Sequence, residues 1–243
     1  MYSLFVKEIK SFLGSLVGYI VMGVFLILTG LFLWVFPFSD NILQRGFADI
    51  NGLFQIAPLV FLLLIPAITM RSFAEEKKTG TIELLLTYPI NDTKIVLAKF
   101  FAALVLLVIS LLPTLIYFVS VYYLGYPKGN IDQGAMWGSY MGLVFLGAAF
   151  AAIGLFVSLI TDNQIIAFLF SVVICFIAWL GFDFVYSFDV FGSFGYFIKT
   201  LGISHHYESI SRGVVDTRDL VYFMSVIVLF LYVSVLRLKS RNW

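Results

Sequence analysis

The sequence predicts an all-α integral membrane protein with six transmembrane helices. The chain is 61% hydrophobic and only 12% charged, whereas soluble proteins are about 45 to 50% apolar and about 25% charged. Apolar stretches of roughly 20 residues, the length that crosses about 30 Å of hydrocarbon, occur six times. They cover residues 15–36, 53–70, 95–124, 137–160, 164–181 and 220–236. These spans use most of the chain, so we expect one transmembrane domain over residues 1–243.

The first element is an amphipathic helix over residues 1–13. Its apolar side chains recur at helical spacing, with cations on the opposite face. The apolar face comprises Leu4, Phe5, Ile9, Phe12 and Leu13, and the polar face Ser3, Lys7 and Lys10. Such a helix lies flat on the inner leaflet, although it could instead be an extension of the first span. That span is too long for a signal peptide and lacks a small-residue cleavage site, so we expect it to be retained.

Pairs of small residues mark two places where helices are expected to approach closely. Gly14 and Gly18 form a small-xxx-small pair at the start of the first span, and Gly138 and Gly142 form one in the fourth. Small residues let helix backbones come close together in lipid. Both pairs therefore predict tight contacts, either within the chain or between subunits.

Prolines interrupt two of the spans. Pro58 and Pro66 lie in the second span and Pro113 in the third. Each removes a backbone hydrogen bond, which predicts a kink in the helix.

The segment 182–219, before the last span, is rich in aromatic residues and broken by Gly192 and Gly195. Aromatic rings settle at the headgroup level, so we expect one or two short re-entrant helices in the outer leaflet. An interfacial anchor without a transport role is the alternative. The adjacent His205 and His206 project in different directions and cannot form one metal site alone; we expect both to be solvated.

Positive charge sets the orientation. Ten of the fifteen Lys and Arg residues lie on the side of the N-terminus, and five lie on the other side. The ten are Lys7, Lys10, Arg71, Lys77, Lys78, Lys94, Lys99, Arg237, Lys239 and Arg241. Both termini and the polar insert 71–94 are therefore expected in the cytoplasm.

The insert 71–94 has its own local pattern. A charged turn over residues 75–78 stops at Gly80, a residue that can take the left-handed conformation that ends a helix. A second short helix is expected to begin at Thr81, to carry Glu83 in its first turn and to end at Pro89. The insert thus predicts a helix, a sharp break and another short helix at the membrane surface.

Several functional classes lack their usual residues. No ionisable side chain lies near the middle of a span, and Lys99 is close enough to the inner end to snorkel. The chain has neither a G-x-x-x-x-G-K-[ST] phosphate loop nor an H-E-x-x-H motif, and no span carries the polar cluster of an intramembrane hydrolase. We therefore expect no catalytic residue, cofactor or metal. Energy for any transport would have to come from a partner, and the insert is the expected docking surface.

Residues 74–90, AEEKKTGTIELLLTYPI, resemble the cytoplasmic loop of type-2 ABC exporter permeases, E-E-x-x-x-G-T-x-E-x-L-L-x-x-P. The matching residues are Glu75, Glu76, Gly80, Thr81, Glu83, Leu85 and Pro89. The amphipathic N-terminus, the six spans and the broken outer segment are similar to that family as well. Within it, the chain most resembles the permease of the gliding-motility ABC transporter, with nitrous-oxide-reductase maturation permeases as near relatives.

The resemblance implies a mechanical role in the bacterial inner membrane. Two permease subunits would pair, and each would dock a separate ATPase through a coupling helix in residues 71–94. Glu75, Glu76 and Glu83 would contact the ATPase, while Gly80 and Pro89 would shape the loop. No nucleic acid partner is expected. The alternatives are a scaffold that recruits a cytoplasmic partner through residues 71–94, or a simple solvated loop, and nothing in the sequence names a substrate.

Overall fold

The computed structural model describes residues 1–38, 41–46, 48–83, 91–188 and 195–240. Throughout these residues the secondary structure is helical, and six helices are long and apolar enough to cross a membrane. They run over Leu16–Val35, Asn51–Lys78, Asp92–Leu124, Gln133–Ile160, Gln164–Ser187 and Thr217–Lys239. The predicted all-α fold with six spans is confirmed.

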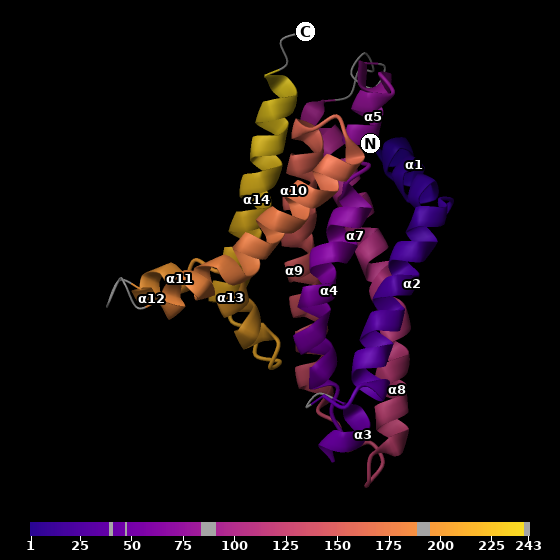
Figure 1. Ribbon diagram of the computed structural model, residues 1–243, viewed down its shortest axis with the longest axis vertical. Helices are drawn as coiled ribbons and strands as arrows, with labels where there is room; N and C mark the ends of the chain where they lie inside the picture. The colour runs from indigo at the N-terminus through magenta and orange to yellow at the C-terminus, as the bar shows by residue number, and fades with distance from the viewer. Residues whose placement is uncertain (39–40, 47, 84–90, 189–194, 241–243) are drawn as a thin grey trace.

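The helices follow one another with short connections (Figure 1). The first half contains α1 (Tyr2–Leu13), α2 (Leu16–Gly30), the π-helical η1 (Leu31–Val35), α3 (Ile42–Arg45), α4 (Asn51–Thr69), α5 (Ala74–Lys78), α7 (Asp92–Leu111), the 3-10 turn η2 (Leu112–Thr114) and α8 (Leu115–Leu124). The second half contains α9 (Gln133–Ile160), α10 (Gln164–Phe176), the π-helical η3 (Ile177–Gly181), α11 (Phe182–Ser187), α12 (Gly195–Lys199), α13 (Ile203–Ile210) and α14 (Thr217–Lys239).

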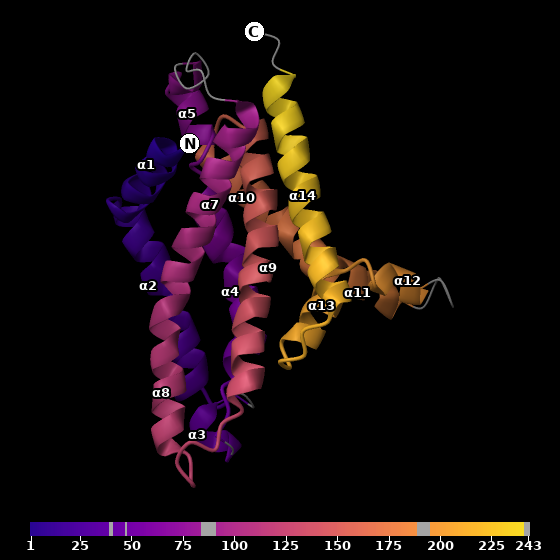
Figure 2. The ribbon, with the colours of Figure 1, turned by 180° about the vertical axis from the view of Figure 1, so that it is seen from behind.

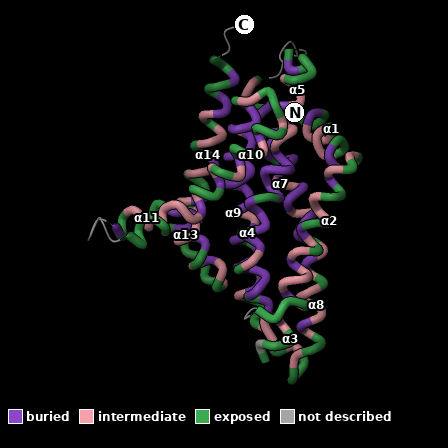
Figure 3. The backbone as a smooth tube through the Cα atoms, viewed as in Figure 1, coloured by how far each residue is buried: buried purple, intermediate pink, exposed green. Residues whose placement is uncertain are grey.

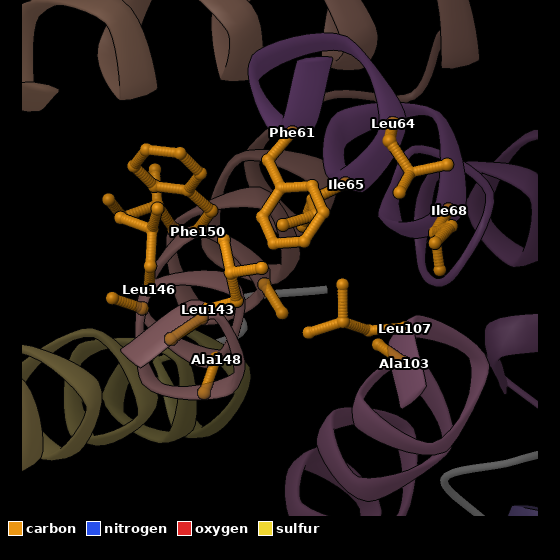
Figure 4. Packing of buried hydrophobic residues seen from close by; sticks show 14 of the residues in the cluster. Phe61, Leu64, Ile65, Ile68, Ala103, Leu107, Leu143, Leu146, Ala148 and Phe150 are labelled. Carbon is orange, nitrogen blue, oxygen red and sulfur yellow. The ribbon is translucent and has the colours of Figure 1, made fainter. Parts of the chain in front are cut away.

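Three helices, α4, α7 and α9, form the centre of the bundle. Most of their apolar side chains are buried, whereas most side chains of α2, α10 and α14, which surround them, are exposed or only partly buried (Figure 3). Figure 4 shows Phe61 and Ile65 of α4, Leu107 of α7, and Leu146 and Phe150 of α9 gathered between the three helices. The exposed faces of the outer helices are apolar, as expected for surfaces covered by lipid or by another membrane protein.

The predicted close approach at Gly138 and Gly142 is confirmed, and it lies within the chain. A Cβ added at Gly142 would come within 2.7 Å of Ile210 of α13, and one at Gly138 within 2.8 Å of the carbonyl oxygen of Gly213. Both glycines are buried. The small residues of α9 therefore seat α13 and the turn after it, and this face is not free for a second subunit.

The prolines have different effects in the two spans. Helix α4 runs through Pro58 and Pro66 without interruption. Pro113, in contrast, lies in the 3-10 turn that separates α7 from α8.

Helix α1 is separate from the first span and is not an extension of it. Its C-terminal cap is Gly14, and Ser15 then caps α2 by accepting a hydrogen bond from the backbone N–H of Gly18 at 3.1 Å. Leu4 and Phe12 are buried, and α1 packs mainly against α7.

The described residues of the aromatic outer segment form three short helices, where one or two were expected. Helices α11 and α12 project sideways from the bundle, and α13 turns back against α9 (Figures 1 and 2). Their depth in the outer leaflet stays a prediction. The expectation that both histidines are solvated is wrong for His206, whose side chain is only 16% exposed because it lies against Asp219 of α14.

Candidate functional site

The N-terminal helix α1, the short helix α5 and the beginning of α7 meet at one end of the bundle. The C-terminal end of α14 lies at the same end (Figure 1). Helix α4 stops at Thr69, and the polar α5 follows after a short turn. The described residues of the charged insert 71–94, predicted from the sequence, therefore lie at this end of the molecule, next to the central helices α4, α7 and α9.

Gly80 makes the break after α5. Its φ is +71°, a conformation that residues with a Cβ rarely adopt. The preceding turn is closed by hydrogen bonds from the N–H of Thr79 to the carbonyl of Glu75 at 3.0 Å and from the N–H of Gly80 to the carbonyl of Lys77 at 3.1 Å. A Cβ at Gly80 would meet no neighbour, so the backbone conformation, and not lack of space, calls for glycine. The predicted left-handed break is confirmed.

A buried lysine joins the three elements. Lys99, the eighth residue of α7, has a fully buried side chain. Its Nζ lies 2.7 Å from Glu8 Oε1 of α1 and 3.0 Å from Glu76 Oε2 of α5, and it donates a hydrogen bond to the carbonyl of Ser72. The ring of Phe73 lies 4.9 Å from the same nitrogen. A buried ammonium needs such partners, because an unpaired one would lose its hydration without compensation.

Glu76 also forms an ion pair with a lysine of α1. Its Oε1 lies 2.9 Å from Lys7 Nζ. Burial opposes the charge of Lys7, but the hydrogen bond to Glu76 and the nearby carboxylates raise the pKa of Lys7 above its ordinary value. Glu76 thus lies between a buried and a largely exposed cation, and it ties α5 to both α1 and α7.

Ser158 of α9 fixes the beginning of α5 from the other side. Its hydroxyl oxygen accepts hydrogen bonds from the N–H groups of Phe73 at 3.0 Å and Ala74 at 3.1 Å, and it donates to the carbonyl of Met70 at 3.1 Å. The first N–H groups of a helix have no partner within the helix, so Ser158 caps α5 from a neighbouring span. One turn earlier, a Cβ at Gly154 would come within 2.1 Å of the hydroxyl of Thr69, so α9 and the end of α4 are in direct contact.

Residues 38–243, most of the chain, match the family described as ABC-2 family transporter protein. The chain belongs to this family. It is therefore a membrane permease component of an ABC transporter. A comparison with curated proteins gave no match.

The residues that the permease motif predicted fall into two groups. Glu83, Thr81 and Gly80 are exposed, and Glu75 is partly exposed. Glu76 is 7% exposed and faces Lys99. Residues 81–83 are helical, as expected, but the hydroxyl of Thr81 contacts the hydroxyl of Thr79 at 2.9 Å. The predicted Leu85 and Pro89 lie outside the described residues.

Lys99, Glu8 and Ser158 are functional-site residues that sequence reasoning did not find. Lys99 was expected to snorkel toward the surface, and this is wrong: its ammonium is buried against two carboxylates. A signal existed for Lys99, because an ionisable residue within an apolar span is rare and usually has a partner. Ser158 gives no comparable signal in the sequence.

A cavity of about 300 Å³ opens beside this ion-pair network. Its wall comes from α1, α4, α5 and α7 and from the turns on either side of α5. The wall has three cationic side chains, Lys7, Arg71 and Lys99, and three carboxylates, Glu8, Glu75 and Glu76, so its formal charges balance.

Proposed function

We propose that this permease is the membrane subunit of an ABC exporter that is energised by a separate ATPase subunit docked on residues 71–94. The observation that carries the proposal is the construction of α5. Glu75, Gly80, Thr81 and Glu83 are available at the surface, while the opposite side of the same segment is held by Lys99 and Ser158. Because α5 is exposed on one side and attached to buried helices on the other, a conformational change in a bound ATPase could be transmitted through it to the centre of the bundle.

In this proposal Glu76 acts inside the permease. Its carboxylate is buried between Lys7 and Lys99, so it positions α5, while Glu75 and Glu83 offer charge to the ATPase. Leu85 and Pro89 remain part of the proposed docking loop on the basis of the motif.

The proposed topology places both termini and the docking loop in the cytoplasm, with residues 182–219 on the outer side of a bacterial inner membrane. Two facts support it. The cationic residues are more numerous on this side in the sequence, and the N-terminus, α5 and the C-terminal end of α14 lie at one end of the bundle (Figure 2).

We also propose that a second permease subunit covers part of the apolar face formed by α2, α4 and α10. This face has a groove of about 180 Å³ lined almost entirely by apolar side chains, among them Val24, Leu28, Leu63 and Phe168. A role in gliding motility is the finer part of the proposal, and it is supported by the loop pattern over residues 74–90 alone.

The test uses two variants of the exposed loop. Gly80→Pro removes the positive φ, because proline is restricted to negative φ, and Glu83→Ala removes an exposed carboxylate. Both should insert and fold normally, but they should weaken ATPase binding or uncouple hydrolysis, with Gly80→Pro more severe. The measurements are ATPase pulldown and hydrolysis rate in nanodiscs, with a melting curve for each variant.

Lys128→Met, an exposed lysine outside residues 71–94, is the matched control. Normal binding and coupling in both loop variants would contradict the proposed docking site. A scaffold would differ from a transporter in another way: it would bind its partner without changing any hydrolytic rate.

A further inference from the structure

The outer half of the molecule contains a histidine held between a carboxyl oxygen and a backbone carbonyl oxygen. His206 Nδ1 lies 2.7 Å from Asp219 Oδ1, and Nε2 lies 2.9 Å from the carbonyl oxygen of Thr200. Asp219 is 8% exposed. The imidazole also stacks on the ring of Tyr222, with ring centres 3.9 Å apart and planes inclined by 20°.

This geometry requires an additional proton. A neutral imidazole can donate from one nitrogen only, whereas an imidazolium donates from both. With a neutral His206 and an ionised Asp219, a nitrogen lone pair would face either the carboxylate or the carbonyl of Thr200. Two protons on the pair, as imidazolium with carboxylate or as imidazole with carboxylic acid, satisfy both contacts. The stacked ring of Tyr222 favours the imidazolium, because aromatic faces attract cations.

We propose that His206 is a proton-dependent clasp that fastens the outer helices α12 and α13 to the last span. The contacts join three parts of the chain: α13 through His206, the turn after α12 through Thr200, and the first turn of α14 through Asp219. Tyr222 of α14 adds a second connection by donating from its hydroxyl to the carbonyl of Leu201 at 2.6 Å. Loss of the proton breaks one of the two hydrogen bonds of the imidazole and loosens the turn from α14.

The surrounding ionisable groups leave Asp219 as the principal partner. From α14 the ring faces Asp219 and Tyr222, with Arg218 next to Asp219 in sequence. From α13 it faces His205, whose ring centre is 5.5 Å away, and Glu208 pairs with Arg212 at 2.9 Å. Lys199, at the end of α12, lies over the ring of Tyr186, and Asp183 of α11 accepts a hydrogen bond from Ser204.

The sign of the pH dependence follows from the proton count. The closed clasp holds two protons on the His206–Asp219 pair and the open form holds fewer, so the clasp is favoured at low pH and weakens as the pH rises. The proposal concerns the outer segment alone and does not rest on a docked ATPase.

Hydrogen exchange of the full chain in nanodiscs tests it. The amides of Thr200, Leu201 and Gly202 donate to backbone carbonyls in the turn that the clasp holds. After correction for the intrinsic pH dependence of exchange, their protection in the wild type should fall on the order of tenfold between pH 5.5 and pH 8, because a charge-assisted hydrogen bond is lost.

His206→Gln should show low protection at both pH values, because its side chain does not titrate. His205→Gln is the matched control and should retain the wild-type response. Protection that is independent of pH in the wild type, or an unchanged response in His206→Gln, would overturn the proposal. If only His205→Gln abolished the pH response, the response would belong to His205, and the proposal would also be overturned.

Discussion

Replacing Lys99 with methionine should destabilise the inner end of the bundle. Methionine retains most of the apolar length of the lysine stem and leaves little cavity, so the change removes the charge and its hydrogen bonds. Glu76 would keep Lys7 at 2.9 Å, whereas Glu8 would lose its contact at 2.7 Å. Removing one partner of a buried pair costs about 3 to 5 kcal/mol. Because the side chain of Glu8 is 18% exposed and water can screen it in part, we take the lower end, about 3 kcal/mol.

Thermal unfolding in nanodiscs measures this cost. For a chain of this size a change of 1 kcal/mol shifts Tm by roughly 2 to 4 °C, so Lys99→Met should melt about 6 to 12 °C below the wild type. Lys94→Met is the control, because Lys94 is exposed on the same helix and surface changes usually stay within about 0.5 kcal/mol. Adding Glu8→Gln to Lys99→Met should recover part of the loss, because the unpaired carboxylate is then gone.

The reasoning would be refuted if Lys99→Met melted together with Lys94→Met. It would also be refuted if the double variant lost as much stability as the two single changes added together, since the two side chains would then not interact.

Two further predictions concern the attachment of α5 and the topology. Ser158→Ala leaves the N–H groups of Phe73 and Ala74 without their acceptor and should cost about 1 to 3 kcal/mol; melting curves check this, and an unchanged Tm would show that water or another group replaces the hydroxyl. Cysteines that replace the exposed Lys78 and Lys128 in a Cys175→Ala background should react with an impermeant reagent from opposite sides of the membrane, because the long third span lies between them. Labelling of both from one side would contradict the six-span arrangement.

Local features of the fold were predictable from the sequence because they depend on neighbouring residues. Span positions follow from continuous apolar stretches, since any segment that crosses lipid must be apolar over its whole length. The break at Gly80 follows from the conformational freedom of a single residue after a charged turn, and the structure gives it a φ of +71°.

The contacts that fix the site could not be read in this way, because they join residues that are distant in sequence. Lys99 pairs with Glu8, 91 residues away, and Ser158 caps α5 across 85 residues. Snorkelling is the natural expectation for a lysine near a span end when only its own helix is considered. It fails here because α1 and α5 bring two carboxylates over the end of α7.

The position of the two attachments decides where a push on α5 would go. Lys99 connects α5 to α7 and Ser158 connects it to α9, and these two helices form the buried centre together with α4. Glu8 shares Lys99 with Glu76, so α1 cannot remain in place when α5 moves against α7 unless a buried ion pair breaks, at a cost of about 3 to 5 kcal/mol. Helix α1, α5 and the inner end of α7 should therefore move together, with bending confined to the junction at Gly14 and Ser15 and to the break at Gly80. In the proposed exporter, force from the ATPase would reach the central helices first, and would reach α2 through that junction and through its packing against α4.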